Sequence, residues 1–173
     1  MNIMQLKTLL PDSLKITIDK AVEEVIKNPE LYSQMLELAF TGEKRFAQRA
    51  SRVVYYAGVK QPELALPLYG TIINNLQKIE NDSIKGTLTA LFTELPLPEN
   101  EELLGILTSF CFEAMNTISE KATMKVYPMQ VLYRITKIYP ELKNELVLIL
   151  RNQMEFEKPS YQAVARRILK KIG

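Results

Sequence analysis

The sequence predicts an all-α fold in which about four helix pairs and a C-terminal helix stack in a row. The tripeptide Pro-Glu-Leu occurs three times, starting at Pro29, Pro62 and Pro140. The flanks of the last two copies match at an offset of 78 residues, or two steps of 39, so that Val53 corresponds to Val131. Apolar residues recur at three- and four-residue spacing on both sides of these prolines, as in paired amphipathic helices. A period of about 33–47 residues with two helices per unit is typical of helical repeat proteins.

Composition restricts the kinds of function. The 173 residues are 47% hydrophobic and 24% charged, which is ordinary for a folded globular domain. With 22 basic and 20 acidic side chains the net charge is +2, so bulk attraction to a nucleic acid is not expected. The chain has no histidine and one cysteine, Cys111. This excludes a Ser-His-Asp or Cys-His nucleophile and leaves too few ligands for a zinc site, so we expect no enzyme, no metal and no cofactor.

The sequence shows neither a signal-like segment nor a membrane span. The first fifteen residues carry charges and Pro11, and the longest apolar stretch, 146–150, is far shorter than the about 20 residues that cross a bilayer. A single cysteine forms no intrachain disulfide, which suits a reducing compartment. We therefore expect a cytoplasmic protein that contacts no membrane.

The helices are expected in one repeat domain over residues 1–173. After a short lead-in, the expected units are 13–40, 43–79, 82–116, 119–157 and a terminal half-unit, 159–173. Asp12 or Ser13 is expected to accept a hydrogen bond from a free amide of the first helical turn. Pro29 ends that helix and begins its partner, because proline breaks the hydrogen-bond ladder but suits the first helical position. Gly42 ends the first unit, since glycine tolerates the left-handed conformation after a helix.

The later units carry similar signals. Pro62 turns the chain in the second unit, and Pro67 predicts either a kink or a late start of the next helix. Asn81-Asp82-Ser83 is a capping cluster that begins the third unit. The segment 101–116 is apolar almost all round, which predicts that it is covered on several sides. Pro128 predicts a kink in the fourth unit, and the basic end around Arg167 predicts a polar cap on the stack.

Three segments carry a resemblance to the HEAT-repeat or armadillo-like α-solenoid family. They are RASRVVYYAGVKQPELALPLYGTIINNL at 49–76, YPMQVLYRITKIYPELKNELVLILRNQM at 127–154 and QAVARRILKKIG at 162–173. They share an Arg before small residues in the first helix, a Pro in the turn and a Leu/Ile stripe in the second helix. The third unit has lost Pro-Glu-Leu, and the first keeps little beyond it. The resemblance implies a curved, right-handed superhelix whose second helices line a concave face that holds a partner.

Four residues form a basic flank on the first helix of the second unit, Arg45, Arg49, Arg52 and Tyr56. Their spacing of i, i+4, i+7 and i+11 places them in one stripe beside the apolar face. Such a stripe suits phosphate or an acidic peptide. The alternative is that it is a solvated flank, or that its arginines pair with acidic side chains of a neighbouring unit.

Six polar residues of the second helices form a concave line. They are Thr71, Asn74, Lys78, Ser109, Glu113 and Asn152. Short, mixed polar side chains suit a peptide or protein better than a nucleic acid, which requires clustered Lys and Arg. The alternative is that these are ordinary solvated helix faces.

The sequence therefore predicts a non-enzymatic interaction module or scaffold that binds a protein or peptide on its concave face. One alternative is a nucleic-acid-binding or DNA-repair protein similar to the HEAT-like alkylbase DNA glycosylases. The lack of tryptophan and the nearly balanced charge disfavour it. Another is a small subunit or assembly factor whose ends stack on a copy of itself.

Overall fold

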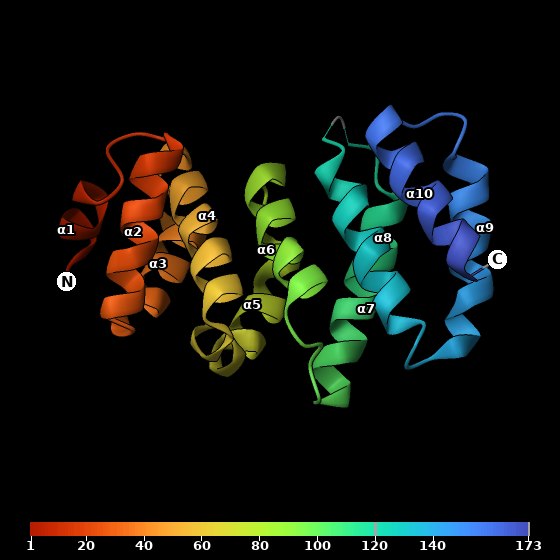
Figure 1. Cartoon of the computed structure of the whole chain (residues 1–173), viewed down its shortest axis with the longest axis horizontal. Coiled ribbons are helices and arrows are strands. Elements are labelled where there is room, and N and C mark those ends of the chain that lie inside the picture. Colours follow the sequence, from red (N-terminus) through yellow and green to blue (C-terminus); the bar gives the residue numbers. More distant parts are fainter. Residues whose placement is uncertain (120, 173) are drawn as a thin grey trace. The chain divides into compact units, whose positions relative to one another are not determined.

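The computed structural model describes residues 1–119 and 121–172, and the regular elements in that part of the chain are all helical (Figure 1). The chain divides into two compact units, Met1–Pro96 and Leu97–Gly173. The boundary falls between the two helices of the third expected pair.

Unit 1 is built around one long helix. Its α-helices are α1 (Ile3–Thr8), α2 (Lys15–Lys27), α3 (Glu30–Thr41), α4 (Lys44–Lys60), α5 (Tyr69–Asn75) and α6 (Asp82–Glu94). Short 3-10 turns at Pro62–Leu64 and Leu66–Leu68 precede α5, and another at Leu76–Lys78 follows it. α4 packs against α2, α3 and α6, so a side chain on its flank lies close to residues from distant parts of the sequence.

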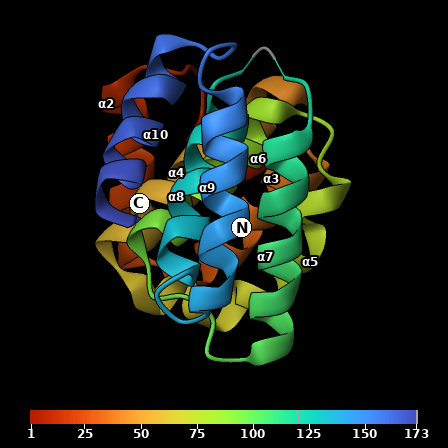
Figure 2. The same ribbon diagram turned by 90° about the vertical axis from the view of Figure 1, so that its right-hand side faces the viewer.

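In the described part of unit 2, residues 97–119 and 121–172, the α-helices number four. They are α7 (Glu101–Asn116), α8 (Thr123–Ile135), α9 (Lys143–Gln153) and α10 (Pro159–Ile172), with a 3-10 turn at Pro140–Leu142 before α9. α8 packs against the other three. In Figure 2, α7 and α9 run upward, and α10 runs downward. The apolar α7 buries Leu107, Phe110 and Cys111. Burial raises the pKa of the Cys111 thiol, which keeps it protonated and unreactive.

Several predicted helix ends are confirmed by the hydrogen bonds. Asn81 caps α6 by accepting a hydrogen bond from the Ile84 amide at 3.1 Å. The expected cap of α2 by Asp12 or Ser13 is not present, because the N-cap residue is Leu14 and no side chain caps this helix. Asp12 instead accepts a hydrogen bond from the Leu14 amide at 2.9 Å, just before the first helical turn. Pro67 lies in a 3-10 turn and α5 begins two residues later, so the second helix of this unit starts late instead of kinking.

Two other local expectations were also wrong. The lead-in contains the helix α1, which Asn2 and Gln5 cap reciprocally through hydrogen bonds of 2.9 Å each. Gly42 ends α3 with φ −74° and not in the left-handed conformation. A Cβ atom at this position would lie 2.6 Å from the Leu38 carbonyl oxygen and 2.7 Å from Leu38 Cδ1. Glycine is therefore needed here for a close approach of the chain.

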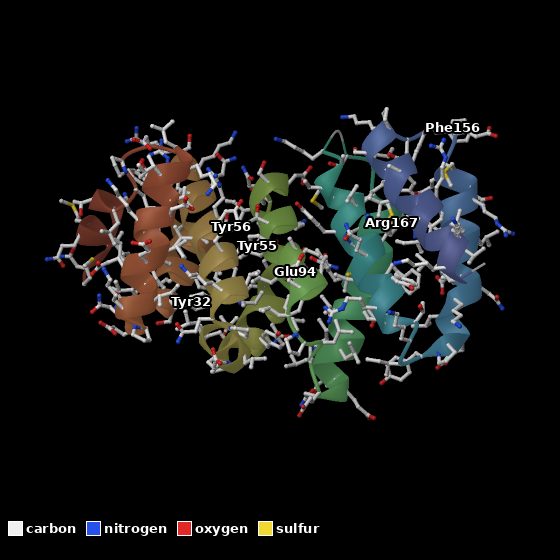
Figure 3. All side chains as sticks on the ribbon, viewed as in Figure 1. Tyr32, Tyr55, Tyr56, Glu94, Phe156 and Arg167 are labelled. Carbon is white, nitrogen blue, oxygen red and sulfur yellow. The ribbon has the colours of Figure 1, made fainter. Side chains whose placement is uncertain are left out.

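A tyrosine joins α3 to α4 inside unit 1. Tyr32 is 1% exposed, and its hydroxyl donates a hydrogen bond to the Val54 carbonyl oxygen at 3.0 Å (Figure 3). A Cβ atom on Gly58 would lie 2.6 Å from this hydroxyl oxygen. The lack of a side chain at Gly58 thus gives Tyr32 room to reach α4, and burial raises the pKa of Tyr32.

Candidate functional site

Three of the four residues of the basic flank line one pocket of unit 1. The pocket lies between the loop before α2, the start of α4 and the start of α6, and its volume is about 340 Å³. We call it the basic pocket. Its lining residues are Ser13, Arg45, Gln48, Arg49, Ser51, Arg52, Ser83 and Thr87. The lining therefore contains three guanidinium groups and no carboxylate.

Two of these arginines are fixed by backbone carbonyl groups. Arg49 Nη1 donates a hydrogen bond to the Leu10 carbonyl oxygen, and Arg52 Nη1 donates one to the Ser13 carbonyl oxygen, both at 2.8 Å. Each bond spans 39 residues, the step inferred from the repeat. A carbonyl group orients a guanidinium without cancelling its charge, so both arginines keep their positive charge and their other N–H donors.

The third arginine contacts an aromatic ring. The guanidinium of Arg45 lies 4.8 Å from the centre of the Phe46 ring, which is also 5.7 Å from Arg49 and 4.9 Å from Lys7 Nζ. Arg45 is exposed and donates no hydrogen bond to the described part of the chain. The aromatic face steadies these cations weakly and leaves their donors available.

No ion pair within residues 1–119 and 121–172 includes an arginine of the basic pocket. Lys7 pairs with Glu43 at 3.0 Å, and this hydrogen bond is the main reason that the pKa of Glu43 is lowered. The pKa of Asp12 is also lowered, first by a hydrogen bond from the Thr17 side chain, then by the Leu14 amide, and least by the charge of Arg49. The predicted pairing with acidic side chains of a neighbouring unit is therefore not what holds these arginines.

The hydroxyl groups in the pocket add further hydrogen-bonding capacity. Ser51 and Thr87 donate to backbone carbonyls of their own helices at 2.8 Å. The hydroxyls of Ser13 and Ser83 have no hydrogen-bond partner in the described part of the chain. The pocket thus presents charged donors from α4 and free hydroxyl donors from the two other segments that line it.

Tyr56, the fourth residue of the basic flank, lies outside the basic pocket. It is 46% exposed, and its ring lies edge-on to Tyr55 with the ring centres 5.1 Å apart (Figure 3). It lines a different pocket with Asp19, Val22, Glu23, Val59 and Lys60. The flank predicted from sequence therefore divides into a basic pocket and a separate tyrosine.

The residues of the concave line are all exposed. Thr71 and Asn74 lie on α5 and Lys78 lies in the turn after it, while Ser109 and Glu113 lie on α7 and Asn152 on α9. Lys78 lines a pocket of about 630 Å³ near the end of α3 and the start of α6. Three of the six belong to each unit, so the line as one binding surface stays a prediction.

Sequence reasoning missed the serine and threonine residues of the basic pocket. Ser13 and Ser83 are far from α4 in sequence and were interpreted only as capping residues. One signal was present, since Ser13 and Arg52 are separated by the repeat step. Residues one step apart in a stacked repeat are natural neighbours.

Several polar side chains of unit 2 connect its helices. Lys125 is buried on α8 and forms an ion pair with Glu157, which precedes α10. Gln153 donates to the Met115 carbonyl oxygen at 2.7 Å and accepts from the Tyr161 hydroxyl at 3.0 Å. These bonds connect α7, α9 and α10.

Among residues 1–119 and 121–172, no group of three or more Cys, Asp or Glu side chains is placed to hold a metal ion. Nor does any of their helices combine the length and the apolar character that crossing a bilayer requires.

A comparison with protein families gives one result. A profile described as HEAT repeat domain matches residues 6–172. No curated protein and no solved structure gave a match. Together with the helical structure of the described residues, the family match confirms the predicted all-α, HEAT-type solenoid class and the resemblance seen in the sequence. The chain belongs to the HEAT repeat domain family.

Proposed function

We propose that the protein is a non-enzymatic interaction module that binds an acidic segment of a protein partner, with the basic pocket of unit 1 as the anchor. HEAT repeats typically mediate protein interactions, and their stacked helices offer extended surfaces for this purpose. The concave line remains a candidate for further contacts with the same partner.

The observation that supports the proposal is the set of three arginines around one pocket without a carboxylate partner. Like charges that share a small space repel one another, so such a cluster is unfavourable until an anion enters it. Arg49 and Arg52 also have a structural role, because they hold the loop before α2. Arg45 holds no loop, and its charge acts on Glu43 only as the smallest of the causes that lower the pKa of that carboxyl.

A protein segment suits the pocket better than a nucleic acid does. Basic and acidic residues are equal in number in residues 1–96, so the positive charge of the basic pocket is local. A nucleic acid is held by many Lys and Arg residues along its backbone, and its affinity depends on how many phosphates are neutralised. A single pocket supplies one such contact, whereas a peptide can anchor one or two acidic side chains there.

The test measures binding of two fluorescein-labelled peptides to the full chain by fluorescence anisotropy. One peptide is rich in Glu and Asp, and the other has these residues replaced by Gln and Asn. The proposal predicts saturable binding of the acidic peptide alone, weakened at least about tenfold by Arg45→Glu and by higher salt. The matched control is Lys44→Glu on the adjacent exposed residue, which does not line the basic pocket. Equal weakening by both variants, or no saturable binding, contradicts the proposal.

A further inference from the structure

We infer that the basic pocket recognises a phosphate monoester, the group on a phosphoserine or phosphothreonine side chain, in preference to a carboxylate. This inference rests on the proposed binding of a protein segment and adds the chemical group that the pocket takes.

The number of donors around the pocket exceeds what a carboxylate can use. A carboxylate has two oxygen atoms in one plane, and a single guanidinium fork satisfies both. A phosphate monoester has three terminal oxygen atoms pointing in different directions and a charge of about −1.5 to −2 at pH 7. Three guanidinium groups on α4 and the hydroxyls of Ser13 and Ser83 approach the pocket from three segments of the chain. Such an arrangement suits a tetrahedral dianion.

Two of the arginines are already fixed before a ligand arrives. The hydrogen bonds of Arg49 to Leu10 and of Arg52 to Ser13 each use one Nη1 atom and restrict the rotation of a long side chain. Less conformational entropy is then lost on binding. Because the hydrogen-bond partners are carbonyl groups, a phosphate displaces no ion pair from these side chains.

The start of α6 adds a favourable field. Ser83 lies in the first turn of this helix of 13 residues, where the backbone amides point outward and the helix dipole is positive. Asp82 shares this turn and opposes the effect, but it does not line the pocket. The helix start therefore supports the arginine cluster without being the main attraction.

The size of the pocket is consistent with one side-chain group. Its volume of about 340 Å³ lies at the lower end of the range of about 300–1,000 Å³ that is usual for ligand sites. A phosphorylated side chain can enter it while the rest of the peptide stays on the surface.

The experiment compares three forms of one labelled dodecapeptide with the full chain: phosphoserine, Glu and Ser at the central position. Fluorescence anisotropy at physiological salt is expected to show the phosphoserine form binding at least about tenfold more tightly than the Glu form. From pH 5 to 7.5 its affinity should rise, since the second phosphate pKa is about 6, while that of the Glu form stays nearly constant. The chain contains no histidine to mimic this change. The charged neighbours on the three segments are Asp12, Lys15, Glu43, Lys44, Asp82 and Lys85.

Matched variants locate the site. Arg45→Gln is expected to weaken the phosphoserine peptide about tenfold, and Lys44→Gln less than about twofold. Arg49→Lys keeps the charge but loses the planar fork, so it should also weaken binding about tenfold. Circular dichroism of each variant verifies that the fold is retained.

The outcomes separate this inference from the proposed function. Equal affinity for the phosphoserine and Glu forms overturns the phosphate preference and leaves the interaction module intact. Binding of free O-phosphoserine without binding of any peptide supports the phosphate site and refutes the interaction module. A single-stranded oligonucleotide that competes as well as the phosphopeptide overturns the inference, because the pocket then reads a nucleic-acid backbone. The inference is likewise overturned if neither peptide nor O-phosphoserine binds at millimolar concentration.

Discussion

Arg52 Nη1 donates a hydrogen bond to the carbonyl oxygen of Ser13, at 2.8 Å and across 39 residues. One helical turn earlier on α4, Arg49 makes the same kind of bond to Leu10, also across 39 residues. The repeat step of the sequence is therefore visible as a pair of parallel bonds between a helix and the loop one step before it. These bonds build one wall of the basic pocket and leave its positive charge in place.

The arginines of the pocket are expected to differ in their effect on stability. Arg49→Gln should lower the free energy of unfolding by about 1–2 kcal/mol, because it removes a partly buried, charge-assisted bond to the Leu10 carbonyl. Arg45→Gln should cost less than about 1 kcal/mol, since it removes only an aromatic contact and a weak attraction to the exposed Glu43. Urea denaturation measures both. A larger cost for Arg45→Gln would mean that Arg45 has a structural role that its contacts do not show.

A glycine substitution tests the packing between α3 and α4. Gly58→Ala should destabilise the protein by about 1–3 kcal/mol, because the new Cβ lies 2.6 Å from the Tyr32 hydroxyl and 3.1 Å from Leu91 Cδ2. The control is Gly105→Ala on α7, where no atom lies within 4 Å. It should stabilise by up to about 1 kcal/mol through helix propensity. Thermal unfolding should show a lower melting temperature for Gly58→Ala and a higher one for Gly105→Ala. Shifts in the same direction would contradict the close packing at Gly58.

The partly buried ion pair of unit 2 is expected to matter more than an exposed one. Glu157→Gln leaves Lys125, which is 9% exposed, without its carboxylate partner. The substitution Glu157→Gln is expected to lower the free energy of unfolding by about 3 kcal/mol. The control, Lys15→Gln, removes an exposed pair with Asp19 and should have no measurable effect, because water screens that pair. Equal melting temperatures for Glu157→Gln and the unmodified chain would refute a stabilising role of the Lys125–Glu157 pair.

The protein should lose stability in alkaline solution. Burial raises the pKa of Cys111, Tyr32 and Tyr161 in the folded state, with Glu157 adding to the effect on Tyr161. In the unfolded chain these groups ionise near their ordinary pKa values of 9.0 for cysteine and 10.0 for tyrosine. Each therefore favours the folded state fully below those values and less as the pH rises above them. Urea midpoints should be lower at pH 10.5 than at pH 8, and the fall should be smaller in Tyr32→Phe. If the urea midpoint of the unmodified chain were the same at pH 8 and pH 10.5, the burial of these groups would be contradicted.

Much of the helix pattern was predictable because its signals are local. Pro29, Pro62 and Asn81 act on the residues next to them, so their effects were readable without the fold. The helix α1 was missed although Asn2 and Gln5 have the spacing of a reciprocal cap. Gly42 was placed at a helix end for the wrong reason, since the close approach of Leu38 is a property of the folded chain.

The candidate site was only partly predictable. The helical wheel put Arg45, Arg49, Arg52 and Tyr56 on one side of the helix. It does not show how far along the helix axis a pocket extends. Tyr56 lies four residues past Arg52, about 6 Å further along the helix axis, and belongs to another pocket. The helix α6 contributes Ser83 and Thr87 to the pocket because it packs against α4. This packing cannot be predicted from a local sequence pattern.

The most direct test of the basic pocket is an NMR titration of the full chain with O-phosphoserine. Saturable chemical-shift changes are expected at the Nε–H groups of Arg45, Arg49 and Arg52 and at the Ser83 amide. None is expected at the exposed Arg166 and Arg167 of α10. Shifts that do not saturate, or that are as large at α10 as on α4, would contradict the presence of a binding site in the basic pocket.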